Sequence, residues 1–223
     1  MFWKWDIRAN EYNRRMFGGF FEFRASFAGC ARSGILIKPD MKHGPRPIWI
    51  AIILALAAQG AVALGASGVS LLAIDRRTRE VLVSQNPQTM RPPASTAKLV
   101  TALVAIERLD MDRWVRVSRR AAAQPPSKAG IQAGERWKVR DLLYALLLES
   151  GNDVAVALAE AAAGDERTFA GWMTEKARDL GCGRTTFGNA SGLPHPANRT
   201  CAADLARLAD AAYRNAVLRG VLA

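Results

Sequence analysis

A serine and a lysine three positions apart open the apolar segment that most constrains what this chain can form. Residues 91–102 read RPPASTAKLVTA, so that Ser95 precedes Lys98 at the start of a helical pattern. On a helix, positions i and i+3 share one face, and the Lys98 amine can lie beside the Ser95 hydroxyl. A serine hydroxyl is a poor nucleophile until a neighbouring base takes its proton. The spacing therefore predicts a nucleophile and its base in the first turns of a helix.

Lys98 can act as a base near neutral pH only if its pKa is lowered. The macrodipole disfavours positive charge in the first turn of a helix. The apolar residues that follow Lys98 predict its partial burial, which also disfavours the ammonium form. The alternative interpretation is that Ser95 merely caps the helix after two prolines, a common position for serine.

A second polar break interrupts an apolar stretch further along the chain. Residues 141–149 read DLLYALLLE, the triplet Ser150, Gly151 and Asn152 follows, and an apolar helical pattern resumes over 153–163. This arrangement would present a serine and an asparagine from a tight turn between two helices. The alternative is a plain helix break, because glycine and asparagine suit the end of a helix.

Together these motifs resemble those of the low-molecular-mass penicillin-binding proteins, the serine-type D-alanyl-D-alanine carboxypeptidases of the penicillin-recognising enzyme family. The matching patterns are PAS-x-x-K-L-x-T-A and LL-x-x-SGND-x-x-x-ALAE, in that order. Residues 177–181 and 186–193 are similar to the family's A-x-x-LG and T-x-F-x-N-x-x-GL patterns, and 203–209 to the helix that follows. The resemblance covers about residues 68–216.

The resemblance implies an α/β (α+β) fold of the β-lactamase/transpeptidase type, with an antiparallel sheet flanked by helices. It implies that Ser95 is the acyl-ester nucleophile, Lys98 the general base and Ser150 a proton relay. Asn152 would position Lys98 and the substrate, and Gly151 would contact the substrate. The expected substrates are D-Ala-D-Ala stem peptides of peptidoglycan, and β-lactams would be covalent inhibitors. The resemblance implies neither a cofactor nor a metal.

The family's third motif, Lys-Thr-Gly on a strand lining the site, has no counterpart after Asn152. The segment 127–130, SKAG, precedes Ser150 and lies in a polar loop pattern. We therefore expect residues 67–223 to be the N-terminal part of a catalytic domain, incomplete at its C-terminal end, with little or no activity by itself.

Two other functions stay open. A class A β-lactamase shares Ser-x-x-Lys, but it normally carries Ser-Asp-Asn and a downstream Glu-x-x-Leu-Asn, and neither follows here. A catalytically inactive envelope protein that at most binds peptidoglycan is the alternative from another class. Rapid turnover of a β-lactam would indicate the first, and the absence of any adduct would indicate the second.

Residues 41–66 follow the plan of a secretory signal peptide. Met41–Arg46 is basic, 48–58 is apolar, and Ala61–Ala63 supplies an A-x-A cleavage site. The alternative is a single membrane anchor. We expect an exported, periplasmic protein, associated with the inner membrane if the segment is retained. Residues 1–40 show no clear period, and we interpret them as an N-terminal extension produced by a misplaced start codon.

The formal net charge of +11 is not evenly spread: residues 1–40 contribute +3 and 41–66 contribute +2, which leaves +6 for the rest, where basic side chains are scattered among acidic ones. No basic stripe with interleaved aromatic residues is found, which argues against nucleic acid as a partner. A mildly basic surface suits work near anionic envelope polymers. In an oxidising compartment Cys182 and Cys201 could pair, but their spacing does not decide it.

Hydrophobic periodicity predicts a strand hairpin followed by a helical part. The expected strands cover 69–74 and 80–84, and the expected helices cover about 95–109, 139–149, 153–163, 166–180 and 201–216.

Overall fold

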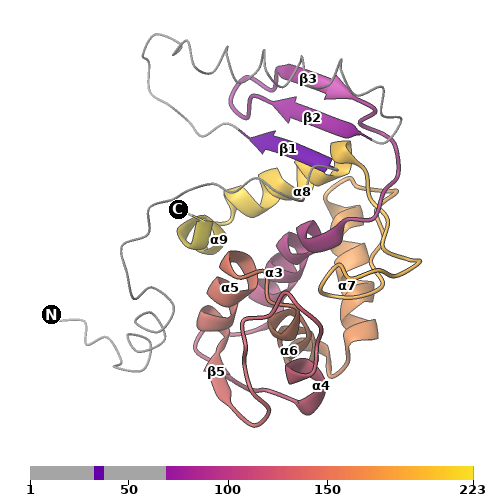
Figure 1. The fold of residues 1–223 in the computed structure, drawn as a ribbon. Helices are drawn as coiled ribbons and strands as arrows, with labels where there is room; N and C mark the ends of the chain where they lie inside the picture. The colour runs from indigo at the N-terminus through magenta and orange to yellow at the C-terminus, as the bar shows by residue number, and fades with distance from the viewer. Residues whose placement is uncertain (1–32, 38–68, 223) are drawn as a thin grey trace, which may run out of the picture. The chain divides into compact units, whose positions relative to one another are not determined.

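The computed structural model describes residues 33–37 and 69–222 of the 223-residue chain (Figure 1). Its elements are β1 (Ser33–Ile37), β2 (Ser70–Ile74), β3 (Val81–Gln85), the 3-10 turn η1 (Ala94–Thr96), α3 (Ala97–Arg108), β4 (Trp114–Arg116), α4 (Arg119–Ala122), β5 (Arg136–Lys138), α5 (Val139–Leu148), α6 (Asn152–Ala163), α7 (Glu166–Asp179), α8 (Ala202–Arg214) and α9 (Ala216–Leu222).

The predicted hairpin is present as the antiparallel pair β2 and β3. Its turn is closed by Asp75, whose carboxylate accepts the backbone N–H groups of Arg77 and Thr78 at 2.9 Å each. Arg79 adopts a left-handed backbone with φ of 65°. Glycine usually fills such positions, so the turn forms here despite a side chain that disfavours it.

A third strand joins this sheet from the N-terminal forty residues, for which no strand was predicted. Strand β1 pairs in parallel with β2, with Ser33 opposite Ser70 and Ile37 opposite Ile74. Its sequence, SGILI, has the apolar and β-branched residues that suit a strand. It belongs to the same compact unit as residues 69–222. The predicted signal segment, 41–66, lies outside the described residues.

Helix α8 lies beside the sheet (Figure 1). Leu72 of β2 is buried against Ala202 and Ala206, two small residues that let the strand and the helix approach closely. At the far end of the helix, Asp210 forms ion pairs with Arg76 and Arg79 of the hairpin turn. The hairpin is therefore attached to α8 by apolar contacts and by charge.

The larger core lies among the helices. The first eight residues of α6 are all buried, and this helix packs against α3, α4, α5 and α7. The largest fully buried side chains include Phe169, Leu142, Leu143, Leu146, Leu158 and Met173. Phe169 and Met173 are buried residues of α7. The start of α6 is thus held rigidly beside α3, and this pair carries the candidate site.

The structure adds elements that the periodicity does not predict. The two-stranded pair β4 and β5 and the short helix α4 occupy the connection between α3 and α5. The helix expected over 201–216 ends at Arg214, because the Asn215 side chain accepts the N–H groups of Val217 and Leu218 and begins a new helix, α9. None of the helices described is long and apolar enough to cross a membrane.

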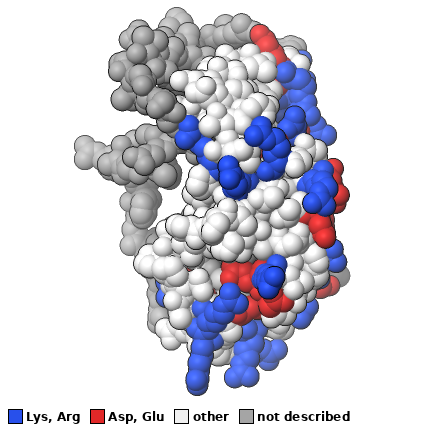
Figure 2. All heavy atoms as spheres, turned by 90° about the vertical axis from the view of Figure 1, so that its right-hand side faces the viewer, with Lys and Arg blue, Asp and Glu red and all other residues white. Residues whose placement is uncertain are grey.

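The charged side chains of the surface lie in separate groups among uncharged ones (Figure 2). On the face shown in Figure 2, basic and acidic side chains lie interspersed, with no single continuous basic stripe. This distribution agrees with the scattered charges seen in the sequence.

Candidate active site

Ser95 lies in the 3-10 turn η1, directly before α3, and its side chain is exposed. The interpretation of Ser95 as a helix cap is wrong, because the residue before α3 is Thr96, and neither η1 nor α3 has a side-chain cap hydrogen bond. Lys98, in the first turn of α3, is only 2% exposed. Its Nζ donates to Ser95 Oγ across 3.3 Å, as the i, i+3 spacing predicts. An exposed hydroxyl is therefore backed by a buried amine.

Two further oxygen atoms surround the Lys98 amine. Nζ donates to Asn152 Oδ1 at 2.8 Å and to the backbone carbonyl of Ser191 at 3.0 Å. Burial lowers the pKa of Lys98 from 10.5 to about 8, although the negative charge of Asp153 acts in the opposite direction. A lysine with a pKa of about 8 is neutral in roughly one molecule in ten at pH 7, against fewer than one in a thousand at a pKa of 10.5, so it can accept a proton.

The turn between α5 and α6 places the second motif. Ser150 adopts a left-handed backbone with φ of 55°, which ends α5 and lets α6 begin two residues later. Gly151 is required by packing, because a Cβ atom there would lie 2.8 Å from Asp153 Oδ1 and 2.9 Å from a methyl group of Val154. Asn152 is the first residue of α6 and is buried, with its oxygen on Lys98.

A third segment completes the surroundings of Lys98, and its position was not predicted. The turn 189–192 supplies the Ser191 carbonyl, and it is fastened to α3 by Thr101, whose Oγ1 donates to the Ala190 carbonyl at 2.6 Å. The Ala190 N–H donates to a carboxylate oxygen of Glu166 at 3.0 Å. The matching family pattern over 186–193 indicated that this segment matters, but only the fold brings its carbonyl to the lysine.

The structure thus joins three of the predicted residues, Ser95, Lys98 and Asn152, through one amine. Gly151 and Ser150 lie in the turn that leads to Asn152. Ser191 and Asp153 are the participants that sequence reasoning did not assign. Within the described part of the chain, no group of three or more His, Cys, Asp or Glu side chains is arranged to hold a metal ion.

The two cysteines of the described region are free and buried. The Cys182 thiol donates to the Asp204 carbonyl, and burial raises its pKa to about 11. A thiol with such a pKa is a poor nucleophile at neutral pH. Cys182 therefore does not compete with Ser95 for that role.

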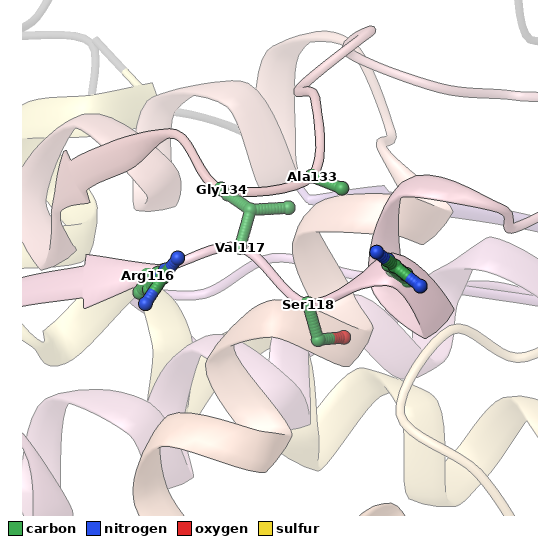
Figure 3. Close-up of a pocket in the computed structure, with 6 residues that line it drawn as sticks. Arg116, Val117, Ser118, Ala133 and Gly134 are labelled. Atoms are coloured by element: carbon green, nitrogen blue, oxygen red, sulfur yellow. The ribbon is translucent and has the colours of Figure 1, made fainter.

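The structure also has a surface hollow of about 440 Å³ that the candidate catalytic residues do not line (Figure 3). It is lined by Arg116, Val117, Ser118, Arg119, Ala133 and Gly134. The Ser118 hydroxyl is already engaged, since it accepts the Ala121 N–H at the start of α4. None of the candidate catalytic residues lines this hollow.

Comparison with known proteins identifies the family of this chain. The family model described as D-alanyl-D-alanine carboxypeptidase matches residues 58–220. The chain belongs to the D-alanyl-D-alanine carboxypeptidase family. It is 36% identical over 145 residues to D-alanyl-D-alanine carboxypeptidase DacF of Bacillus subtilis, covering 63% of this chain and 37% of that protein. Over 162 residues it is 32% identical to a Streptomyces D-alanyl-D-alanine carboxypeptidase, covering 67% and 56%.

Solved structures of the family share the fold. The structure of a D-alanyl-D-alanine carboxypeptidase from Mycobacterium tuberculosis superposes with a TM-score of 0.64 at 32% identity, covering 67% of this chain and 57% of that one. The mixed helix and sheet fold of the β-lactamase/transpeptidase type is therefore confirmed. The chain spans less than two thirds of the length of each of these relatives.

Proposed function

We propose that this chain carries the nucleophile and the base of a serine-type D-Ala-D-Ala carboxypeptidase that acts on peptidoglycan stem peptides. The observation that supports this most is the position of the Lys98 amine. It lies between the exposed Ser95 hydroxyl and the buried Asn152 amide, and its pKa is about 8. Membership of the family supports the same substrate class.

The first step forms a tetrahedral intermediate. Ser95 Oγ attacks the carbonyl carbon of the penultimate D-alanine, and neutral Lys98 takes the hydroxyl proton. The Ser95 backbone N–H stabilises the oxyanion that develops on that carbonyl. Asn152 holds the resulting ammonium and the substrate amide in place.

The second step releases the terminal D-alanine and leaves an acyl-enzyme, and a third step regenerates the enzyme. The bond between the carbonyl carbon and the D-alanine nitrogen breaks, and the proton reaches this leaving nitrogen from Lys98 through the Ser150 hydroxyl. Water then attacks the Ser95 ester while Lys98 accepts a proton from it, and this proton returns to Ser95 Oγ as the ester bond breaks. A β-lactam ring opened by Ser95 would leave a long-lived acyl adduct on the same oxygen.

Three measurable outcomes separate this proposal from its two rivals. The protein encoded by the complete reading frame is incubated with a diacyl-D-Ala-D-Ala peptide and, separately, with a β-lactam. Release of D-alanine together with a lasting adduct supports the carboxypeptidase. Rapid hydrolysis of the β-lactam instead supports a class A β-lactamase-like enzyme. The absence of both adduct and product supports a non-catalytic envelope protein.

We propose further that the protein is exported and works in the periplasm. The plan of residues 41–66 and the envelope substrate of the family support this. N-terminal sequencing of the protein from a bacterial envelope fraction should give a mature start between Leu64 and Ser67. A stable cytoplasmic product beginning at Met1 would contradict the proposal.

A further inference from the structure

Asp153 is a buried carboxylate beside the candidate site, and no role in the reaction outlined above falls to it. It follows Asn152 in the first turn of α6 and is 0% exposed. Its two oxygens accept four backbone N–H groups, those of Ala129 (3.0 Å), Gly130 (2.9 Å), Ile131 (3.2 Å) and Val154 (2.9 Å). Three of these donors come from one loop, so the carboxylate binds that loop as a fixed anion.

We propose that Asp153 is a positioning residue for the reaction, which fastens the loop 125–131 to the start of α6 and so holds Asn152 against Lys98. The inference rests on the proposed function, because it assigns Asp153 a part in preparing the Ser95 base. It concerns a residue outside the set that would touch the substrate.

The same loop also holds Asn152 directly. Asn152 Nδ2 donates to the Pro125 carbonyl at 3.0 Å, and the Asn152 backbone N–H donates to the Ser127 carbonyl at 2.8 Å. With one N–H of Nδ2 donated to the loop, the amide presents Oδ1 to the Lys98 amine and keeps a second N–H free to face the substrate. If the loop moved away, the Asn152 amide could rotate and lose this orientation.

Gly151 shows how closely Asp153 is fitted. A Cβ atom on Gly151 would lie 2.8 Å from Asp153 Oδ1 and 3.3 Å from the Ala129 Cβ atom. The carboxylate, the loop and the turn after Ser150 therefore occupy one tightly packed volume. Removing the carboxylate would leave backbone N–H groups without partners, which costs free energy in a buried site.

Charge gives Asp153 a second effect on the base. Helices α5, α6, α7 and α8 pack against α3 and carry charged groups that include Asp141, Glu160, Glu166 and Asp204. The negative charge of Asp153 acts on Lys98 and favours its ammonium form. Asp153 thus limits how far burial can lower the pKa of Lys98.

An NMR titration of Lys98 in the 223-residue chain, with and without the substitution Asp153→Asn, tests the proposal. The midpoint for Lys98 should fall by about one pH unit, because the variant loses a nearby opposite charge and the fixed Asn152 acceptor. Asp204→Asn is the matched control, since Asp204 is also buried, accepts the Thr185 hydroxyl and pairs with Arg207. It should lower stability and leave the Lys98 midpoint unchanged.

A folded Asp153→Asn variant with an unchanged Lys98 midpoint would overturn the proposal, as would an equal shift in Asp204→Asn. If Asp153→Asn does not fold, hydrogen exchange in the unaltered chain decides. The Gly130 amide lies on an exposed residue, and it should exchange as slowly as the buried Ile131 amide. Exchange of both at the rate of a free loop would overturn the proposal.

The rate at which a small activated ester acylates Ser95 shows whether Asp153 affects the reaction itself. In Asp153→Asn the acylation rate above pH 9 should fall about tenfold, with its pH midpoint shifted down together with that of Lys98. If Ser95 is not acylated even in the unaltered protein, the proposed function fails. The NMR titration still tests the role of Asp153 in that case.

Discussion

Gly192 packs so closely on Ala94 that a Cβ atom on the glycine would lie 1.8 Å from the Ala94 carbonyl oxygen. Both residues have left-handed backbones, with φ of 81° at Gly192 and 48° at Ala94. The turn that supplies the Ser191 carbonyl therefore rests directly on the turn that carries Ser95. Contact between two segments almost a hundred residues apart sets the geometry of the candidate nucleophile.

Gly192→Ala should push the turn around Ser191 away from the turn that carries Ser95. The methyl group cannot be accommodated beside the Ala94 carbonyl, and alanine is strained at positive φ. We expect a loss of about 2 kcal/mol or more in the free energy of unfolding and at least a tenfold slower acylation of Ser95. Urea unfolding and the rate of labelling by an acylating probe measure the two effects.

Gly181→Ala is the matched control for this substitution. Gly181 has nearly the same φ, 78°, but a Cβ atom there meets nothing within 4 Å. It should show the backbone strain alone, with Ser95 acylation unchanged. Equal effects of both substitutions on acylation would show that the Gly192 contact has no special part in the site.

The rate of Ser95 acylation should rise with pH and reach half of its plateau near pH 8. Lys98 has a pKa of about 8, below its ordinary value of 10.5, and only the neutral amine can accept the hydroxyl proton. Below pH 8 the rate should fall about tenfold per pH unit. A stopped-flow series with a small activated ester between pH 6 and 10 measures the profile.

The same pH series on the Lys98→Ala variant shows whether Lys98 is the base. Without the amine, acylation should be slower by about a hundredfold or more and should lose the rise around pH 8. Lys176→Ala removes a lysine that pairs with Glu107 away from the site, and it should leave the profile unchanged. A rise around pH 8 that persists in Lys98→Ala would assign the base to another group.

Asp210→Ala should weaken the attachment of the β2–β3 hairpin to α8. Asp210 is 9% exposed and forms ion pairs with Arg76, Arg79 and Arg214. Its removal leaves three guanidinium groups close together without a counter-charge, and we expect a loss of about 2 kcal/mol in unfolding free energy. Asp112→Ala, which removes an exposed partner of Lys138 and Arg140, should change stability much less. Equal losses would contradict the role assigned to Asp210.

The spacing of residues along the chain was enough to predict most of the helices and the pairing of Ser95 with Lys98. The i, i+3 rule was enough to bring Ser95 and Lys98 together, because both lie within one turn of the chain. The helices α3, α5, α6 and α7 begin and end within a few residues of their predicted limits. Strands β4 and β5 escaped prediction because three residues are too few to show alternation.

The remaining features depend on contacts between distant segments. The Ser191 carbonyl reaches Lys98 because Thr101 and Gly192 fasten its turn to α3 and η1, and no local pattern encodes this meeting. The parallel pairing of β1 with β2 was likewise invisible, since an apolar run of five residues suits many environments. Asn215 did carry a local signal, as a helix-capping residue inside an apparently continuous helix.

The site of attachment of a fluorescent penicillin tests the central claim most directly. The protein encoded by the complete reading frame is labelled, digested and mapped by mass spectrometry, and the Ser95→Ala variant is treated in the same way. Thr96→Ala is the control, because the Thr96 hydroxyl donates to the Pro93 carbonyl and not to the Lys98 amine. The account predicts one adduct on Ser95, retained in Thr96→Ala and abolished in Ser95→Ala. Undiminished labelling of Ser95→Ala, or an adduct on another residue, would contradict it.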